Sequence, residues 1–101
     1  MLVKVLITRR IKQGSEVDVL VTLSSLRARA MDQPGYISGE TLVGHEDPRK
    51  LIVISTWDSL EHWLQWKDDP SRTQVEALLD PHLLEPTSYE VFLPGARPAR
   101  A

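Results

Sequence analysis

Apolar residues recur along this chain at strand-like and helix-like spacings that follow one another in a simple order. Runs rich in Val, Leu and Ile, with one later aromatic run, predict four strands: Leu2 to Ile11, Tyr36 to Val43, Leu51 to Trp57 and about Ser88 to Leu93. A polar turn, residues 44–50, contains Asp47-Pro48 and separates the second run from the third. We therefore expect these two strands to form an antiparallel hairpin.

A first helix is predicted between the first two strands. Gly14 ends the first strand, Ser15 with Asp18 forms a capping-box pattern, and Pro34-Gly35 stops the helix after Gln33. Apolar residues recur along it at helical spacing, and we expect them to face the core: Val17, Leu20, Val21, Ala28 and Met31.

All three tryptophans lie in a ten-residue segment at the start of a second predicted helix. Asp58 or Ser59 is a suitable N-cap, and the helix should stop near Asp69. A rotation of about 100° per residue gathers one apolar stripe and places two side chains about 120° or more away from its centre. The stripe is Leu60, Trp63 and Leu64, and the two outliers are His62 and Trp66.

Trp66 is therefore expected to be exposed, to meet a partner subunit or to form the wall of a pocket, whereas Trp57 and Trp63 belong to the core. Pro70 suits the first turn of another short helix, capped by Asp69. Its inward residues are expected to be Val75, Leu78 and Leu79.

The order β-α-β-β-α-β predicts an α+β fold of the ferredoxin-like kind, with a four-stranded antiparallel sheet and the helices on one face. The other sheet face is then bare. The strands are nevertheless apolar on both sides, since Leu6 alternates with Val5 and Ile7, and Ile52 with Leu51 and Val53. We expect a homodimer whose two sheets pack face to face, because burial of these side chains adds area that a small chain lacks.

Composition narrows the class of protein. The chain has 101 residues, of which 42% are hydrophobic and 26% charged, and this favours one domain, residues 1–93, followed by a mobile tail, residues 94–101. A net charge of -2 without a basic cluster argues against nucleic acid as a partner. No apolar run is long enough to span a membrane and the start lacks signal-peptide features, so the expected location is cytoplasmic. The absence of cysteine excludes disulfides and thiolate chemistry.

Several local motifs resemble one family. They are Pro34-Gly35-Tyr36, Asp47-Pro48, Ser55-Thr56-Trp57-Asp58-Ser59 and Leu84-Glu85-Pro86. With the order of elements, they make the chain from Leu2 to Leu93 resemble the antibiotic biosynthesis monooxygenase (ABM) domain. Members form dimeric α+β barrels. Some oxidise polycyclic phenols to quinones with molecular oxygen and without metal or flavin, and others resemble haem-degrading monooxygenases.

The resemblance implies a set of site residues and no cofactor. Trp66 matches the helix tryptophan that lines the pocket in both branches, and His62 stands where quinone-forming members can place a polar hydrogen-bonding side chain. His62 is then a candidate base, and Trp66 can stack on an aromatic ring. Tyr36 is expected to hydrogen-bond a substrate oxygen and Arg72 to offset an anion. A solvated or structural His62 is the alternative.

Three functions stay open. One is a cofactor-independent oxygenase acting on a small aromatic or quinol-like metabolite, and another is a non-catalytic ligand-binding or dimerisation module. Haem degradation is disfavoured, because Ile7 and Glu76 stand where that branch has asparagine and histidine, and His82 lies too far along the chain to substitute. No histidine has companions at metal-ligand spacing, so a metal site is not expected.

Overall fold

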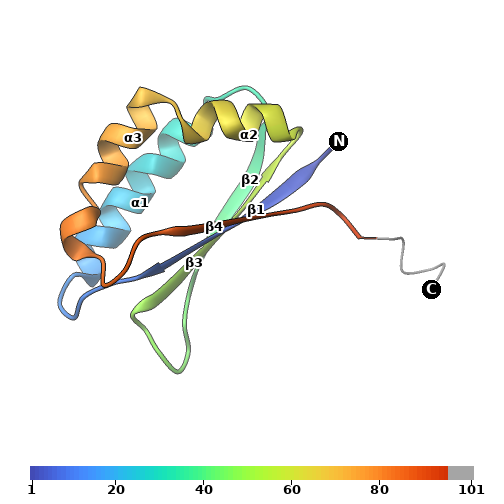
Figure 1. Cartoon of the computed structure of the whole chain (residues 1–101). Coiled ribbons are helices and arrows are strands. Elements are labelled where there is room, and N and C mark those ends of the chain that lie inside the picture. The colour runs from blue at the N-terminus through green and yellow to red at the C-terminus, as the bar shows by residue number, and fades with distance from the viewer. Residues whose placement is uncertain (96–101) are drawn as a thin grey trace.

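The computed structural model describes residues 1–95. Its elements follow the predicted order: β1 (Val3–Arg10), α1 (Glu16–Ala30), β2 (Tyr36–Val43), β3 (Lys50–Trp57), α2 (Leu60–Lys67), α3 (Pro70–Ala77), the short 3₁₀ helix η1 (Asp80–His82) and β4 (Ser88–Phe92). The four strands form one antiparallel sheet in the order β2-β3-β1-β4, and the helices lie on one face of it (Figure 1). The predicted fold and hairpin are confirmed. The predicted tail, from residue 96 onward, lies outside the described residues.

Strand β1 is central in the sheet and separates two kinds of side chain. Val3, Val5, Ile7 and Ile11 point toward the helices and are buried. Arg9 shares this face and is only 2% exposed, which makes it a charged residue in an otherwise apolar row. The period of two in a strand thus directs one charge into the interior.

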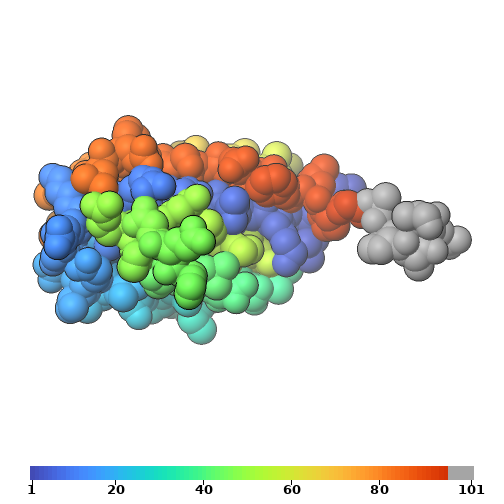
Figure 2. All heavy atoms as spheres, turned by 90° about the horizontal axis from the view of Figure 1, so that it is seen from below, coloured from blue at the N-terminus to red at the C-terminus, as the bar shows by residue number. Residues whose placement is uncertain are grey.

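The opposite face of the sheet carries no helix among the described residues (Figure 2). Leu6 of β1 is paired in register with Ile54 of β3, and both are half-buried. Leu42 of β2 and Phe92 of β4 are 45% and 48% exposed. We call these four residues, with Ile52, the open face. These apolar side chains are the ones the alternation in the strands predicts, and charged residues stand among them, since Glu90 is paired with Leu6, Glu40 with Ile54 and Lys4 with Phe92.

Helix α1 buries a different face from the one we expected. Its buried residues are Val19, Leu23, Leu26 and Ala30. All five predicted inward residues are exposed, so that prediction was wrong: Val17, Leu20, Val21, Ala28 and Met31. The buried set has spacings of four, three and four, which keep side chains on one side of a helix better than the predicted set does. The predicted capping bond of Ser15 is also absent; its Oγ lies 2.9 Å from His82 Nδ1 instead.

Helix α2 is likewise rotated relative to the predicted stripe. Trp63 and Trp66 are buried, at 2% and 5% exposure, whereas Leu60 and Leu64 are 45% and 43% exposed. The helix begins as expected, since Ser59 Oγ accepts a hydrogen bond from the backbone N–H of His62. Two indoles three residues apart bury more apolar area than two leucines, so their face is the one that packs on the sheet.

Helix α3 begins as the sequence indicates, with Asp69 Oδ1 accepting from the backbone N–H of Ser71 and Pro70 in the first turn. Of its three predicted inward residues, Leu79 is fully buried and Val75 half-buried, but Leu78 is 63% exposed. None of the described helices is long and apolar enough to cross a bilayer.

We predict that Trp63→Ala lowers the free energy of unfolding by about 3 to 5 kcal/mol, because it leaves a cavity beneath α2. Leu64→Ala, on the outer side of the same helix, should cost less than about 1 kcal/mol. Urea titrations at equal protein concentration measure both. Equal losses would mean that α2 packs through the face predicted from its leucines.

Candidate active site

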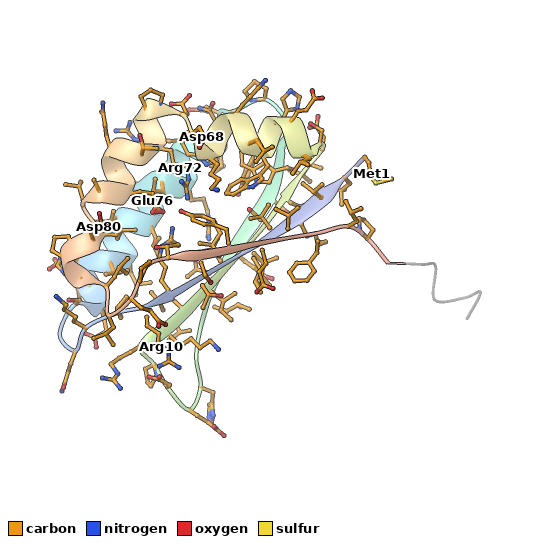
Figure 3. All side chains as sticks on the ribbon, in the orientation of Figure 1. Met1, Arg10, Asp68, Arg72, Glu76 and Asp80 are labelled. Carbon is orange, nitrogen blue, oxygen red and sulfur yellow. The ribbon has the colours of Figure 1, made fainter. Side chains whose placement is uncertain are left out.

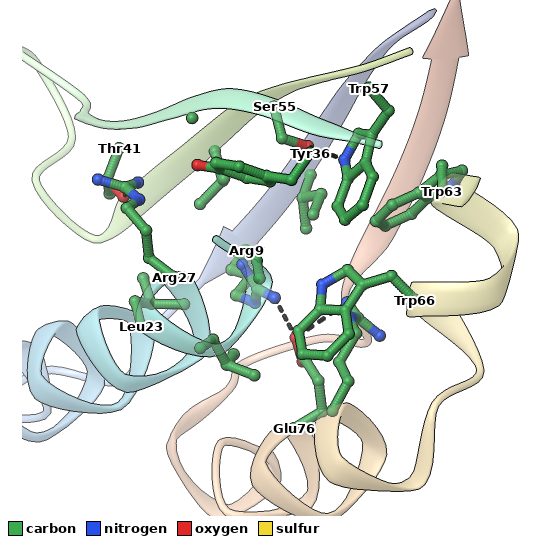
Figure 4. A pocket seen from close by; sticks show the side chains of 16 residues that line it. Arg9, Leu23, Arg27, Tyr36, Thr41, Ser55, Trp57, Trp63, Trp66 and Glu76 are labelled. Atoms are coloured by element: carbon green, nitrogen blue, oxygen red, sulfur yellow. Dashed lines mark hydrogen bonds and ion pairs between the residues drawn. The ribbon is translucent and has the colours of Figure 1, made fainter. Parts of the chain in front are cut away.

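A cavity of about 60 Å³ lies between the sheet and the helices. This is several times the volume that one water molecule needs, so the cavity has room for a few waters. A cavity that holds a benzene ring has about 150 Å³, so a ring would enter this one only as lining side chains move apart. Sixteen residues from β1, α1, β2, β3, α2 and α3 line it, as Figure 4 shows: Ile7, Arg9, Leu23, Leu26, Arg27, Ala30, Tyr36, Gly39, Thr41, Val53, Ser55, Trp57, Trp63, Trp66, Arg72 and Glu76.

Aromatic rings form one side of the cavity. Tyr36 meets Trp57 edge to face with ring centroids 5.3 Å apart, and Trp57 lies 6.0 Å from Trp63. Trp57 Nε1 donates to Ser55 Oγ at 3.2 Å, which fixes the tilt of its indole. Trp66 comes from α2, and its indole nitrogen faces the space below Tyr36 and Trp57 (Figure 4). Such packed faces and edges suit a flat aromatic ligand.

Charged side chains form the other side. Glu76 of α3 pairs with Arg9 of β1, and its Oε1 also lies 3.3 Å from Nη2 of Arg72. The side chains of the two arginines are 2% and 5% exposed, and that of Glu76 is 13% exposed. We call these three residues the ion network. It joins β1 to α3, as the dashed line between Arg9 and Glu76 shows in Figure 4. Figure 3 shows Arg72 and Glu76 on α3, on the helix-covered side of the sheet.

Besides Glu76, Arg72 has several other partners that hold it in place. Its Nη2 donates to Tyr89 Oη at 2.8 Å, and its Nη1 donates to the carbonyl of Lys67 at 3.2 Å. The guanidinium also lies 5.6 Å from the ring centroid of Trp63 and 5.3 Å from that of Tyr89. These contacts fix the cation against aromatic faces, which attract it electrostatically.

A polar contact crosses the edge of the cavity between α1 and β2. Arg27 Nη2 donates to Thr41 Oγ1 at 2.6 Å. Beside it, Gly39 leaves room for Tyr36, since a Cβ at Gly39 would lie 2.6 Å from the tyrosine hydroxyl oxygen. The glycine therefore lets the Tyr36 ring lie along its own strand, with its hydroxyl at the cavity edge.

Of the predicted site residues, the structure brings Trp66, Tyr36 and Arg72 together at this cavity. His62 is not among the lining residues. Its Nδ1 lies 2.6 Å from Asp58 Oδ1, where the imidazole must be the donor because a carboxylate only accepts. The catalytic role of His62 stays a prediction that this placement does not favour.

The Asp58–His62 pair covers Gly35, which has a left-handed φ of 86°. A Cβ there would lie 2.4 Å from both Asp58 Oδ1 and His62 Nδ1, and the Asp58 backbone N–H donates to the Gly35 carbonyl. The hydrogen bond from His62 lowers the pKa of Asp58 below its usual value of 3.8. The pair therefore stabilises the fold above that value, and the contribution is lost as the pH falls through the lower folded pKa.

Arg9 and Arg27 were not predicted as site residues from the sequence. Glu76 was considered only because it stands where the haem-degrading branch has its histidine ligand. A signal for Arg9 existed, because it stands at an inward position of β1 between Ile7 and Ile11. For Glu76 the signal was its spacing of four from Arg72, which places both on one side of α3. Arg27 carries no comparable signal, since it flanks the buried face of α1.

The lining does not fit a haem. No histidine occurs among the residues that line the cavity within the described chain, and the carboxylate of Glu76 is already bound by two arginines. Nowhere in residues 1–95 do three His, Asp or Glu side chains gather as a metal site would need.

The fold is shared with solved structures of low sequence identity. SnoaB, a cofactor-independent oxygenase from Streptomyces nogalater, superposes with a TM-score of 0.85 at 12% identity, over 96% of each chain. A conserved protein from Methanosarcina mazei Go1 also gives a TM-score of 0.85, at 16% identity over 91% of each chain. At this identity the likeness establishes the fold alone.

Sequence comparison is more specific. The chain is 25% identical over 81 residues to protein SchA of Streptomyces halstedii, a match that covers 80% of this chain and 21% of SchA. The chain thus spans about a fifth of the length of this curated relative. The family model described as antibiotic biosynthesis monooxygenase matches residues 2–78. The chain therefore belongs to the antibiotic biosynthesis monooxygenase family.

Proposed function

We propose that this chain is a cofactor-independent monooxygenase that oxidises a small, single-ring phenol or quinol-like compound in the cavity between its helices and its sheet. The observation that carries the proposal is the composition of the cavity wall. Aromatic rings from β2, β3 and α2 face a buried pair of guanidiniums across the cavity, and a single ring is the smallest aromatic ligand that it could widen to accept. The family membership and the name of SnoaB support the same class of reaction.

The chemistry needs no external reductant. A phenol with a free ring position para to its hydroxyl reacts with O₂ as its phenolate: one oxygen atom becomes the second carbonyl of the quinone. The other oxygen leaves as water, together with the hydroxyl proton and the ring hydrogen. The substrate itself supplies all four electrons. The protein has to stabilise the phenolate and exclude bulk water.

In this proposal the cavity residues have separate roles. Trp66 and Trp57 hold the ring, and the Trp66 N–H is free to bind a substrate oxygen. Arg72 supplies positive charge close to the anion and is fixed in place by Tyr89 and Lys67. Tyr36 stands at the cavity edge, where its hydroxyl can reach a second oxygen of the substrate.

We predict that Trp66→Phe lowers kcat/KM for O₂-dependent quinone formation at least about tenfold, the effect of losing about 1.4 kcal/mol of transition-state stabilisation. An oxygen electrode and quinone absorbance, with a panel of single-ring phenols, measure the reaction. Isotopically labelled O₂ should place one atom in the quinone. Gln65→Ala, an exposed neighbour on α2, is the matched control.

No oxygen uptake with any phenol, in a folded protein that still binds them, would replace the proposal with the non-catalytic ligand-binding module. The same assay tests the role predicted for His62. A lower rate for His62→Gln with unchanged thermal stability would make His62 part of the reaction. An unchanged rate would leave it with the structural task of covering Gly35.

We also propose that the working form is a homodimer joined through the open face. Leu42 and Phe92 are about half exposed there, and Leu6, Ile52 and Ile54 lie between them. Full burial of such a side chain is worth about 1.5 to 3 kcal/mol. A second copy of the same sheet could cover this face through a two-fold interface, in which the same patch of both subunits meets.

Sedimentation velocity at micromolar concentration should therefore give twice the chain mass of 11.4 kDa. Ile54→Glu should shift the protein to the monomer, because it would bury an unpaired carboxylate at the interface. Leu20→Glu, an exposed apolar position on α1, is the control and should leave the mass unchanged. A wild-type protein that sediments at 11.4 kDa would contradict the dimer.

A further inference from the structure

We propose that Arg9 binds the anionic oxygen of the ligand through its Nε–H, so that the cavity selects acidic aromatic compounds over neutral ones. This inference deepens the proposed function and rests on it for the identity of the reaction. The binding of the anion itself is independent of catalysis.

The first observation is an unused donor. Arg9 is 2% exposed, and its Nε has no hydrogen-bond partner within the part of the chain that the structure describes. A buried donor of a charged group that stays unpaired is costly, so such atoms in native structures mark a place for a ligand, a water or an ion. Arg9 is one of the residues that line the cavity, so this unpaired donor belongs to the cavity wall, and a ligand that displaces the side chains packed over it would supply the missing acceptor.

The second observation is the imbalance of charge. The charged residues that line the cavity are Arg9, Arg27, Arg72 and Glu76, three cations and one carboxylate. Glu76 is shared between Arg9 and Arg72 and cannot neutralise both. Arg27 is bound to a neutral hydroxyl of Thr41. One negatively charged ligand would reduce the excess of positive charge inside a poorly solvated space.

The third observation is that the nitrogens of the Arg9 guanidinium differ in their partners. Glu76 binds it at Nη2 and leaves Nε free. Glu76 is thus a positioning residue, because it holds the planar group in one orientation while Nε serves the ligand. Arg72 contacts four residues, because it bonds to Glu76, Tyr89 and the Lys67 carbonyl and its guanidinium also lies over the ring of Trp63. Arg9 therefore has the more available N–H of the two.

The class of ligand follows from both walls of the cavity. The aromatic wall accepts a flat ring, and the N–H of a guanidinium is a strong partner for a phenolate or carboxylate oxygen. We infer a ligand with one ring and one negatively charged oxygen, and for the proposed reaction this oxygen is the phenolate itself. The phenol would then ionise more readily when bound, and the protein would need no separate base to prepare it for O₂.

The experiment uses para-nitrophenol, whose phenolate is yellow, and para-nitroanisole, a neutral analogue of similar shape. Quenching of tryptophan fluorescence reports binding, since all three tryptophans line the cavity. At a pH where the phenol is ionised, the wild-type protein should bind the phenolate at least about tenfold more tightly than the neutral analogue, as expected for a charge-assisted hydrogen bond to a buried group.

Arg9→Met should lower the ratio of the affinities for the phenolate and the neutral analogue at least about tenfold. Arg9→Lys should keep part of this preference. The absorbance titration of the bound probe should shift to higher pH in Arg9→Met than in the wild type. The matched control is Arg29→Met, which removes the same charge from the exposed side of α1.

Equal binding of both probes by the wild type would overturn the inference, as would a folded Arg9→Met that binds the phenolate with unchanged affinity. If Arg9→Met does not fold, the binding of the two probes to the wild type and to Arg9→Lys still tests the inference.

Oxygen uptake separates this inference from the proposed function. Phenolate binding through Arg9 without oxygen uptake would contradict only the proposed reaction. Oxygen uptake by a protein that binds the phenolate and the neutral analogue equally would contradict only the role of Arg9.

Discussion

The ion network of Arg9, Glu76 and Arg72 is the constraint on which the interior of this protein depends. Three charged side chains are held away from water between β1 and α3. The removal of one partner from a buried ion pair typically costs about 3 to 5 kcal/mol, whereas well-packed apolar side chains in its place are often neutral or stabilising. Apolar side chains in these three positions could therefore give a core of equal or greater stability. Its presence beside an aromatic cavity is consistent with the anion binding proposed for Arg9.

Most of the fold was predictable because local signals agreed with one another. The four strands, the hairpin at Asp47-Pro48 and the N-caps at Ser59 and Asp69 are set by residues close in sequence. The faces of α1 and α2 were not predictable from the chosen stripes. A helix with apolar residues all round has several possible inward faces, and the packing of the sheet decides among them.

The candidate site was predicted in part, and the failures have a physical cause. Trp66 was named from its position off the helical stripe and from the resemblance, Tyr36 and Arg72 were named for the chemistry that the implied reaction needs, and all three line the cavity. His62 was placed beside Trp66 by a rotation that gave the helix the wrong inward face. Arg9 and Glu76 come from elements far apart in sequence, and only the pairing of β1 with its neighbours and the docking of α3 bring them together.

The strict alternation along β1 has a consequence for how such a domain can diverge. Odd-numbered positions such as Ile7 and Arg9 form the inner wall, while Leu6, between Val5 and Ile7, belongs to the outer layer. Neighbouring codons therefore act on different properties of the molecule. If the cavity binds a ligand and the open face binds a second copy, as proposed, a mutation at an inward position of β1 would alter ligand binding without altering the dimer, and the reverse would hold for an outward position. Ligand choice and assembly could then evolve almost independently on this sheet.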